Sequence, residues 1–342
     1  MKFSFKNDYS EGCHLNILTA LLNHNSDQQA GYGEDQYSLE AKNLIRQKIK
    51  SDSDIYFVSG GTQANLLVIS SILKPYQCVI SAATGHILNN ETGAIEATGH
   101  KILSIDKEDG KLTPEDIIPV LENHKNIPHQ VMPKLVYVSN STELGTVYTL
   151  TELEKLSAFC KENHLYIFMD GARMGHGLTA EISDLTLEKV AQLTDVFYLG
   201  GTKNGALIGE AIVINNNELR QDFAFNIKQR GALLAKGRLL GIQFLELMKE
   251  DLYFELAAHA NRQAMKIKKA LKERGAKFLS DTYTNQIFPI LSNSLIEKLS
   301  EKFEFYVWKK IDDDFSAIRI ITSWNTADEP VDEFIEIINN EI

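Results

Sequence analysis

The residue in this sequence best suited to covalent chemistry is Lys203. It lies in the run Phe197-Tyr-Leu-Gly-Gly-Thr-Lys-Asn-Gly205, where a short apolar stretch ends in small residues. This pattern predicts a buried strand that opens into a loop and presents one lysine. In a partly dry pocket, burial lowers the pKa of an amine, and the neutral amine is a nucleophile that forms Schiff bases. The alternative is an ordinary surface lysine with its ammonium in water.

A second candidate segment, Ser59-Gly-Gly-Thr-Gln-Ala-Asn65, closes one predicted strand and opens a helix. Small residues at this point let backbone N–H groups approach an anion, and the N-terminus of a helix favours negative charge. The alternative is a tight turn in which Thr62 caps the helix. The spacing matches neither a Walker A motif nor the GxGxxG of dinucleotide sites, so a single small phosphate fits best.

Two further positions supply a carboxylate and an imidazole. Asp170 follows five apolar residues at the end of a predicted strand, where a carboxylate needs a cation or hydrogen-bond donors. If Asp170 has only a structural role, Arg173 could be the cation that neutralises it. If it has a functional role, Asp170 keeps a cofactor ring nitrogen protonated and Arg173 binds a substrate carboxylate. His86 is either a hydrogen-bonded turn residue, or a ring that stacks on a flat cofactor or moves a proton.

The elements that must position these residues can be predicted from hydrophobic periodicity. Short apolar runs over 55–59, 78–82, 134–139, 165–169 and 196–199 alternate with helical patterns, such as 62–73 and 151–163, and 210–214 could return as an antiparallel strand. They predict a mostly parallel sheet covered by helices on both faces. Because the carboxyl ends of parallel strands meet in one crevice, the segments 59–63, 170–173 and 202–203 are expected to lie close together.

The last third of the chain has a different pattern. Residues 236–274 look helical with one break, and strands over 286–291 and 317–322 precede an amphipathic helix over 331–338. We therefore expect a large domain over residues 1–240 and a smaller C-terminal α/β domain over 241–342.

Composition excludes several classes of function. The 342 residues carry a net charge of −11, which disfavours a nucleic-acid partner. No apolar run approaches the roughly 20 residues of a membrane helix, and the N-terminus has no signal-peptide pattern. The three cysteines form no CxxC, and the histidines have no metal-ligand spacing. We predict a cytoplasmic protein that binds neither membrane nor metal.

Considered together, the candidate residues meet the requirements of pyridoxal 5'-phosphate (PLP). This cofactor needs a phosphate anchor, a stacking ring, a partner for its pyridinium nitrogen and a lysine that forms a Schiff base. The sequence therefore predicts a PLP site with covalent attachment at Lys203.

The sequence also resembles a known family, the threonine aldolase/aromatic amino acid beta-eliminating lyases of PLP fold type I. The matching stretches follow the family's order along nearly the whole chain: 7–10, 32–35, 59–65, 85–86, 170–173, 202–205 and 318–323. Segments 143–149 and 201–205 look most like the phenylserine aldolase branch. The resemblance implies a mostly parallel seven-stranded sheet in the large domain and a smaller C-terminal α/β domain.

The resemblance implies a role for each site residue. Lys203 forms the Schiff base, Asp170 pairs with the ring nitrogen and His86 stacks on the ring. Other residues are expected to contact the cofactor phosphate or the amino-acid carboxylate. The phosphate contacts are Gly61, Thr62 and Gln63, with Thr202 nearby, and the carboxylate contacts are Arg173 and Arg319. Asn7, which stands where the family usually has serine, is a further candidate for the substrate pocket.

Family members are dimers or tetramers whose active sites lie between subunits. Arg238, in the basic run 228–238, is then a candidate for a phosphate contact from a neighbouring subunit, and the alternative is an ordinary basic helix end. Tyr32 and Asp35 are expected at the same interface.

The implied activity is retro-aldol cleavage of an L-β-hydroxy-α-amino acid to glycine and an aldehyde. One alternative is β-elimination to pyruvate and ammonia, and another is a catalytically silent binding protein on this fold. Many threonine aldolases carry a histidine near the substrate hydroxyl, but here Thr142 or Glu143 falls nearest that position. Removal of the hydroxyl proton is therefore expected to use another group, such as His86 or a water.

Overall fold

The apolar runs of the first 214 residues assemble into one seven-stranded sheet in the computed structural model, which describes residues 2–341. Its strands are β2 (Asp54–Val58), β3 (Gln77–Ala82), β4 (Lys101–Ile105), β5 (Met132–Ser139), β6 (Tyr166–Asp170), β7 (Val196–Gly200) and β8 (Glu210–Ile214). Their spatial order is β2-β8-β7-β6-β5-β3-β4, and only β8 runs antiparallel to its neighbours. The predicted mostly parallel sheet is confirmed, and so is the antiparallel return strand.

Helices cover both faces of this sheet because successive strand side chains point to opposite sides. On β5, Val136 and Val138 belong to one apolar cluster, whereas Leu135 and Tyr137 belong to the other. Residues of α3 (Gly61–Ile72) and α9 (Phe223–Gln229) complete the second cluster. The first cluster includes side chains from α1 (Leu15–Asn23), α2 (Gln36–Ile49), α5 (Pro114–Asn123), α6 (Leu150–Glu162), α7 (Met174–Leu178) and α8 (Leu187–Leu193).

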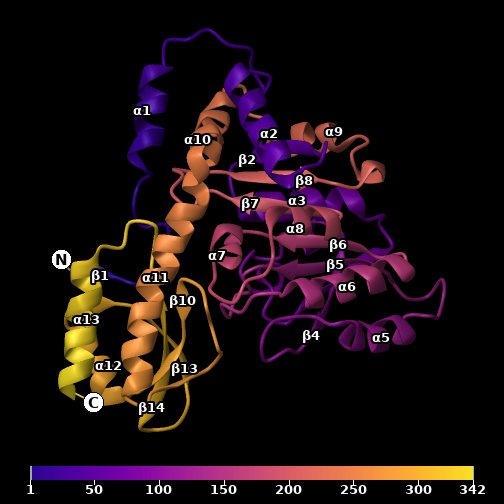
Figure 1. Cartoon of the computed structure of the whole chain (residues 1–342). Helices are drawn as coiled ribbons and strands as arrows, with labels where there is room; N and C mark the ends of the chain where they lie inside the picture. The colour runs from indigo at the N-terminus through magenta and orange to yellow at the C-terminus, as the bar shows by residue number, and fades with distance from the viewer. Residues whose placement is uncertain (1, 342) are drawn as a thin grey trace.

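The strands of a second, smaller sheet come from the chain after residue 276. Its order is β10-β14-β11-β9, with β13 paired to β14, and β1 (Phe3–Ser4) pairs separately with β12 (Phe303–Glu304). The strands are β9 (Lys277–Phe278), β10 (Gln286–Ile287), β11 (Pro289–Ser292), β13 (Tyr306–Lys310) and β14 (Phe315–Ile321). Figure 1 shows α13 (Asp328–Glu341) beside α11 (Leu252–Glu273), near α12 (Asn293–Ser300). These elements share a third apolar cluster.

Two consecutive helices connect the two sheets. Helix α10 (Arg238–Met248) leads into α11 through a kink where Glu250 and Asp251 have positive φ angles of 49° and 61° (Figure 1). The predicted long helix with a break is therefore confirmed. The predicted domain boundary after residue 240 falls inside α10, which packs against helix α2 on the large sheet. The division into two domains at this point stays a prediction. Within residues 2–341, no helix has the length and apolar character to cross a membrane.

Two glycines let the end of β6 and the end of β7 touch at the backbone. The amide of Gly200 donates to the carbonyl of Gly171 at 2.9 Å. A Cβ atom on Gly171 would lie 1.8 Å from the carbonyl oxygen of Tyr198, and one on Gly200 would lie 2.2 Å from that of Ala172. These contacts fix the turn after Asp170 against the strand that leads to Lys203.

We expect Gly171→Ala to destabilise the protein by about 1–3 kcal/mol or more, because the added methyl meets backbone atoms that cannot move independently. The measurement is the free energy of unfolding in urea. Gly12→Ala is the matched control, since a Cβ at Gly12 has no heavy atom within 4 Å. Equal stability of the two variants would contradict this close approach.

Candidate active site

The sheet brings the candidate site residues predicted from the sequence to one of its edges. Asp170 is the last residue of β6, Lys203 follows β7 by three residues, and Gly61 begins the helix that follows β2. His86 begins α4 (His86–Asn89), which follows β3. All four strands point the same way, so the segments predicted to converge do lie at one edge of the sheet.

The carboxylate of Asp170 is held by uncharged donors. It is 4% exposed, and it accepts hydrogen bonds from the hydroxyls of Tyr137 and Tyr198 at 2.5 Å each. The amide of Ala172 and Asn65 Nδ2 also donate to it, at 2.9 and 3.2 Å. Within residues 2–341, no lysine, arginine or histidine forms an ion pair with Asp170. The structural interpretation in which Arg173 neutralises Asp170 is therefore wrong, because Arg173 pairs elsewhere.

Lys203 lies in a region of opposing charges. Burial lowers the pKa of its amine, and the neighbouring Arg173 lowers it further, whereas the carboxylates of Asp8, Asp170 and Glu210 act in the opposite direction. Burial in turn raises the pKa of Glu210 to about 8, although the charge of Lys203 opposes this shift. Glu210 Oε2 accepts a hydrogen bond from the amide of Gly201, in the loop that carries Lys203, at 2.9 Å.

Arg173 forms a buried ion pair with Asp8. Its Nε and Nη2 donate to the two carboxylate oxygens at 2.7 and 3.1 Å, and Asn285 Nδ2 donates to Asp8 at 2.9 Å. Burial alone would raise the pKa of Asp8, but Arg173 and Lys203 outweigh it and hold that pKa at about 2. The sequence analysis assigned no role to Asp8, which lies 165 positions from Arg173.

Arg319, on β14, lies against two aromatic rings. Its guanidinium carbon is 5.2 Å from the ring centre of Tyr306 and 4.8 Å from that of Trp308. Burial lowers the pKa of Arg319, and Arg173 lowers it further. Nη2 makes a long contact with the carbonyl of Lys6 at 3.5 Å, and the buried Nε has no hydrogen-bond partner within residues 2–341. The two predicted carboxylate-binding arginines therefore influence each other electrostatically.

His86 is linked to Asp170 through two polar side chains that the sequence analysis did not single out. His86 Nδ1 lies 2.8 Å from Oε1 of the buried Glu91, and Asn65 Nδ2 donates to the same oxygen at 2.7 Å. The same Asn65 nitrogen also donates to Asp170. A carboxylate that accepts from Nδ1 leaves Nε2 as the unprotonated nitrogen of a neutral imidazole.

The predicted phosphate segment forms the first turn of α3. The helix begins at Gly61 and its N-cap is Gly60, with no side-chain cap. The alternative that Thr62 caps the helix is therefore wrong. Gln63 Oε1 accepts from both the amide and the hydroxyl of Ser59 at 3.0 Å, and Thr202 Oγ1 accepts from the amide of Gly209 at 3.0 Å.

Other predicted residues have partners away from these strand ends. Arg238 donates to the carbonyls of Asp27 and Asn25, in the loop after α1. Asp35 is buried and caps α2, whereas Tyr32 is exposed. Asn7 Oδ1 accepts from the amide of Tyr9 and the hydroxyl of Ser10, at 3.0 and 2.9 Å, so only its amide nitrogen is free for a ligand.

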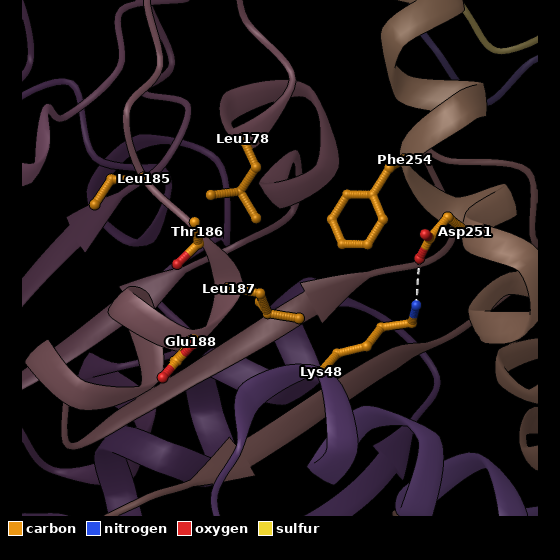
Figure 2. Close-up of a pocket in the computed structure, with 8 residues that line it drawn as sticks. All are labelled: Lys48, Leu178, Leu185, Thr186, Leu187, Glu188, Asp251 and Phe254. Carbon is orange, nitrogen blue, oxygen red and sulfur yellow. Dashed lines mark hydrogen bonds and ion pairs between the residues drawn. The ribbon is translucent and has the colours of Figure 1, made fainter.

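A groove of about 430 Å³ lies outside this constellation. It is lined by Lys48, Leu178, Leu185, Thr186, Leu187, Glu188, Asp251 and Phe254 (Figure 2). Figure 2 shows Lys48 forming an ion pair with Asp251, at the kink between α10 and α11. None of its lining residues is a predicted site residue, so the candidate active site stays at the strand ends.

Comparisons with known proteins show which family this chain belongs to. The family model described as beta-eliminating lyase matches residues 16–294. A low specificity L-threonine aldolase of Pseudomonas aeruginosa is 34% identical over 334 residues, which cover 96% of this chain and 95% of that protein. The chain belongs to the beta-eliminating lyase family. It is an enzyme of the lyase class, as the sequence analysis predicted.

Solved structures that resemble this chain agree with its assignment to the beta-eliminating lyase family. A threonine aldolase of Leishmania major superposes with a TM-score of 0.97 at 46% identity, covering 99% of both chains. An aspartate aminotransferase variant of Thermus thermophilus superposes with a TM-score of 0.72 at 14% identity, covering 100% of this chain and 92% of that one. The second likeness concerns the fold alone, and it confirms the predicted PLP fold type I. Assignment to the phenylserine aldolase branch stays a prediction.

We expect the Asp8–Arg173 pair to make the stability of this lyase depend on pH in the acidic range. Because the folded-state pKa of Asp8 is depressed from 3.8 to about 2, its stabilising contribution is complete above pH 3.8 and is lost as pH falls through 2. We expect the wild type to lose roughly 1 kcal/mol of unfolding free energy from this group between pH 5 and pH 3.

Urea unfolding at both pH values measures this loss, and Asp8→Asn should lack it. Asp52→Asn is the control, since that side chain is 99% exposed. An Asp8→Asn variant with the same pH dependence as the wild type would show that Asp8 is not the titrating group.

Proposed function

We propose that this chain is a PLP-dependent aldolase that cleaves L-β-hydroxy-α-amino acids to glycine and an aldehyde, with the cofactor attached to Lys203. The observation that carries the proposal is one edge of the sheet with an amine of lowered pKa, a buried carboxylate without a cation, and two arginines. The relatives named as threonine aldolases, matched over nearly their whole length, support this choice of reaction.

The residues at the strand ends fit PLP. Asp170 has four hydrogen-bond donors but no cationic partner within residues 2–341, which suits a protonated ring nitrogen. The N-terminus of the 12-residue helix α3 has no side-chain cap, so its amides are free for a phosphate. A Cβ on Gly61 would lie 3.0 Å from the hydroxyl of Tyr198, so a larger residue would crowd this site.

Each side chain then has a defined task. The neutral amine of Lys203 is the nucleophile for covalent attachment, and its lowered pKa makes that form available. Asp170 holds the ring-nitrogen proton, and His86 covers the ring. When bound, PLP supplies a cationic ring that withdraws the electron pair released at the substrate α-carbon. Thr202 and the first turn of α3, from Gly61 through Gln63, hold the phosphate.

The substrate carboxylate is assigned to Arg173 and Arg319. Asp8 already occupies Nε and Nη2 of Arg173, so the carboxylate meets Nη1 of that residue and the guanidinium of Arg319. Asp8 thereby holds the Arg173 fork in place and limits its net positive charge. The free amide nitrogen of Asn7 is a further donor in this region.

We also propose that the chain forms a symmetric homo-oligomer through α1. Leu15, Leu18 and Leu22 form a stripe on that helix and are 70%, 47% and 77% exposed, whereas Ile17 and Ala20 face the core. A stripe of this kind is costly to leave in water, and a second copy of the chain would cover it. The contact of Arg238 with a neighbour's phosphate belongs to this proposal. The cytoplasmic location stays a prediction.

Lys203→Ala should abolish glycine release from L-threonine, L-allo-threonine or phenylserine, together with the visible absorbance of the bound cofactor. Lys269→Ala is the control, because that side chain is 79% exposed. Glycine assays and absorbance spectra of both variants give the answer. Turnover that survives Lys203→Ala would exclude this mechanism, and pyruvate without glycine from serine or cysteine would favour β-elimination instead.

Leu18→Glu combined with Leu22→Glu should shift the protein toward monomer, because two buried charges oppose association. Light scattering coupled to size-exclusion chromatography measures the mass. Ile118→Glu, on the exposed side of α5, should leave the mass unchanged. An unaltered oligomer in the α1 variant would place the interface elsewhere.

A further inference from the structure

Glu143 lies beside the candidate active site, in the segment that leaves β5. At the start of this segment, the amide of Asn140 donates to the carbonyl of Asp170 at 3.0 Å, which ties it to the end of β6. The hydroxyl of the preceding Thr142 is engaged by a different residue, since it lies 2.7 Å from that of Thr146. Thr142 and Glu143 fall nearest the position of the family's histidine, and of the two, Glu143 accepts a hydrogen bond from the amide of His86.

The carboxyl group of Glu143 is anchored through one oxygen only. Oε1 accepts from the hydroxyl of Ser139 at 2.8 Å and from the backbone amide of His86 at 3.0 Å. Oε2 has no hydrogen-bond partner within residues 2–341, and it is not among the fully enclosed polar atoms. A carboxyl group with one oxygen fixed and the other free is oriented for proton transfer.

We propose that Glu143 is a catalytic base of the retro-aldol step, an inference that rests on the proposed aldolase function. The substrate β-hydroxyl proton moves to Oε2 of Glu143, and the O–H electron pair becomes the second bond of the aldehyde carbonyl. The Cα–Cβ pair remains at the α-carbon, which becomes glycine once it is protonated. In the synthetic direction, the same carboxyl group gives the proton to the aldehyde oxygen, which becomes the β-hydroxyl.

The electrostatic surroundings support this role. Burial raises the pKa of Glu143, and the carboxylate of Asp170 raises it further, while its own backbone amide and the hydrogen bonds from Ser139 and His86 oppose the shift. The charge of Glu143 in turn raises the pKa of the phenols of Tyr137 and Tyr148, which burial already keeps neutral at working pH. A base whose pKa lies closer to neutrality transfers protons more efficiently than an ordinary glutamate.

His86 is the competing base. Glu91 engages its Nδ1, so only Nε2 is available to accept a proton. A ring that stacks face to face on a flat cofactor directs its nitrogens along the cofactor plane, rather than toward a hydroxyl above that plane. Glu143 is anchored to the backbone of His86, so it approaches from the side of the loop that follows β5.

The test separates hydroxyl deprotonation from the other steps. Glu143→Gln keeps an oxygen for Ser139 and His86, so the loop should be preserved. We expect kcat/KM for glycine release from L-threonine to fall about 10²–10⁴-fold. Exchange of the glycine α-proton in D₂O, followed by NMR, should continue near the wild-type rate, because that reaction has no β-hydroxyl. Glu91→Gln is the matched variant: it also replaces a glutamate that contacts His86, but it perturbs the His86 ring instead of the proposed base.

The wild type offers a second readout that needs no variant. Because the unprotonated carboxylate is the active form, log kcat/KM should fall as pH decreases through the pKa of Glu143, above the ordinary value of 4.5. Glu143→Gln should lack that limb. Infrared difference spectra of the protein without substrate should show a protonated carboxyl band that titrates in the same range and is absent from Glu143→Gln.

Two outcomes would overturn the proposal. Cleavage that is selectively lost in Glu91→Gln but retained in Glu143→Gln would make His86 the base. Unimpaired cleavage in Glu143→Gln, with wild-type glycine release, would contradict the role of Glu143 while leaving the aldolase function intact. A wild type that releases no glycine would contradict the aldolase function itself.

Discussion

A carboxylate buried without an ion-pair partner is the constraint on which the proposed site depends. Asp170 is enclosed at the end of β6, and two tyrosine hydroxyls, an asparagine amide and a backbone amide hold it in one position. These donors stabilise the charge, but they leave a negative centre that a cationic ring can approach. The fold type I sheet creates that situation, because the carboxyl ends of its central strands meet at one edge.

The same burial shifts the pKa values of neighbouring amines and carboxyl groups in opposite directions. It lowers the pKa of Lys203 and raises those of Glu143 and Glu210. Nucleophilic attachment requires the neutral amine, which a lowered pKa favours, and a carboxylate with a raised pKa accepts a proton more readily. The Asp8–Arg173 pair is the exception, since two opposite charges in contact both remain ionised. One desolvated edge therefore holds a nucleophilic amine, carboxylates of raised pKa and a fixed ion pair.

The sequence predicted those parts of the site whose signal is local. Lys203 and Asp170 each follow an apolar run that predicts a buried strand, and the predicted parallel sheet placed the two together. The partner of Arg173 could not be predicted in this way. Asp170 is three residues away, but the true partner, Asp8, reaches the site only when the N-terminal segment folds beside β14. Sequence alone likewise does not reveal the roles of Glu91, Asn65 and Glu210, because these depend on contacts with residues distant in the chain.

The central claim is that Lys203 carries the cofactor, and one measurement tests it directly. The purified protein, incubated with PLP and reduced with borohydride, is digested and its peptides are identified by mass spectrometry. The account predicts a single phosphopyridoxyl adduct on Lys203 in the peptide that follows β7. An adduct on a different lysine, or a protein that retains no adduct at all, would contradict it.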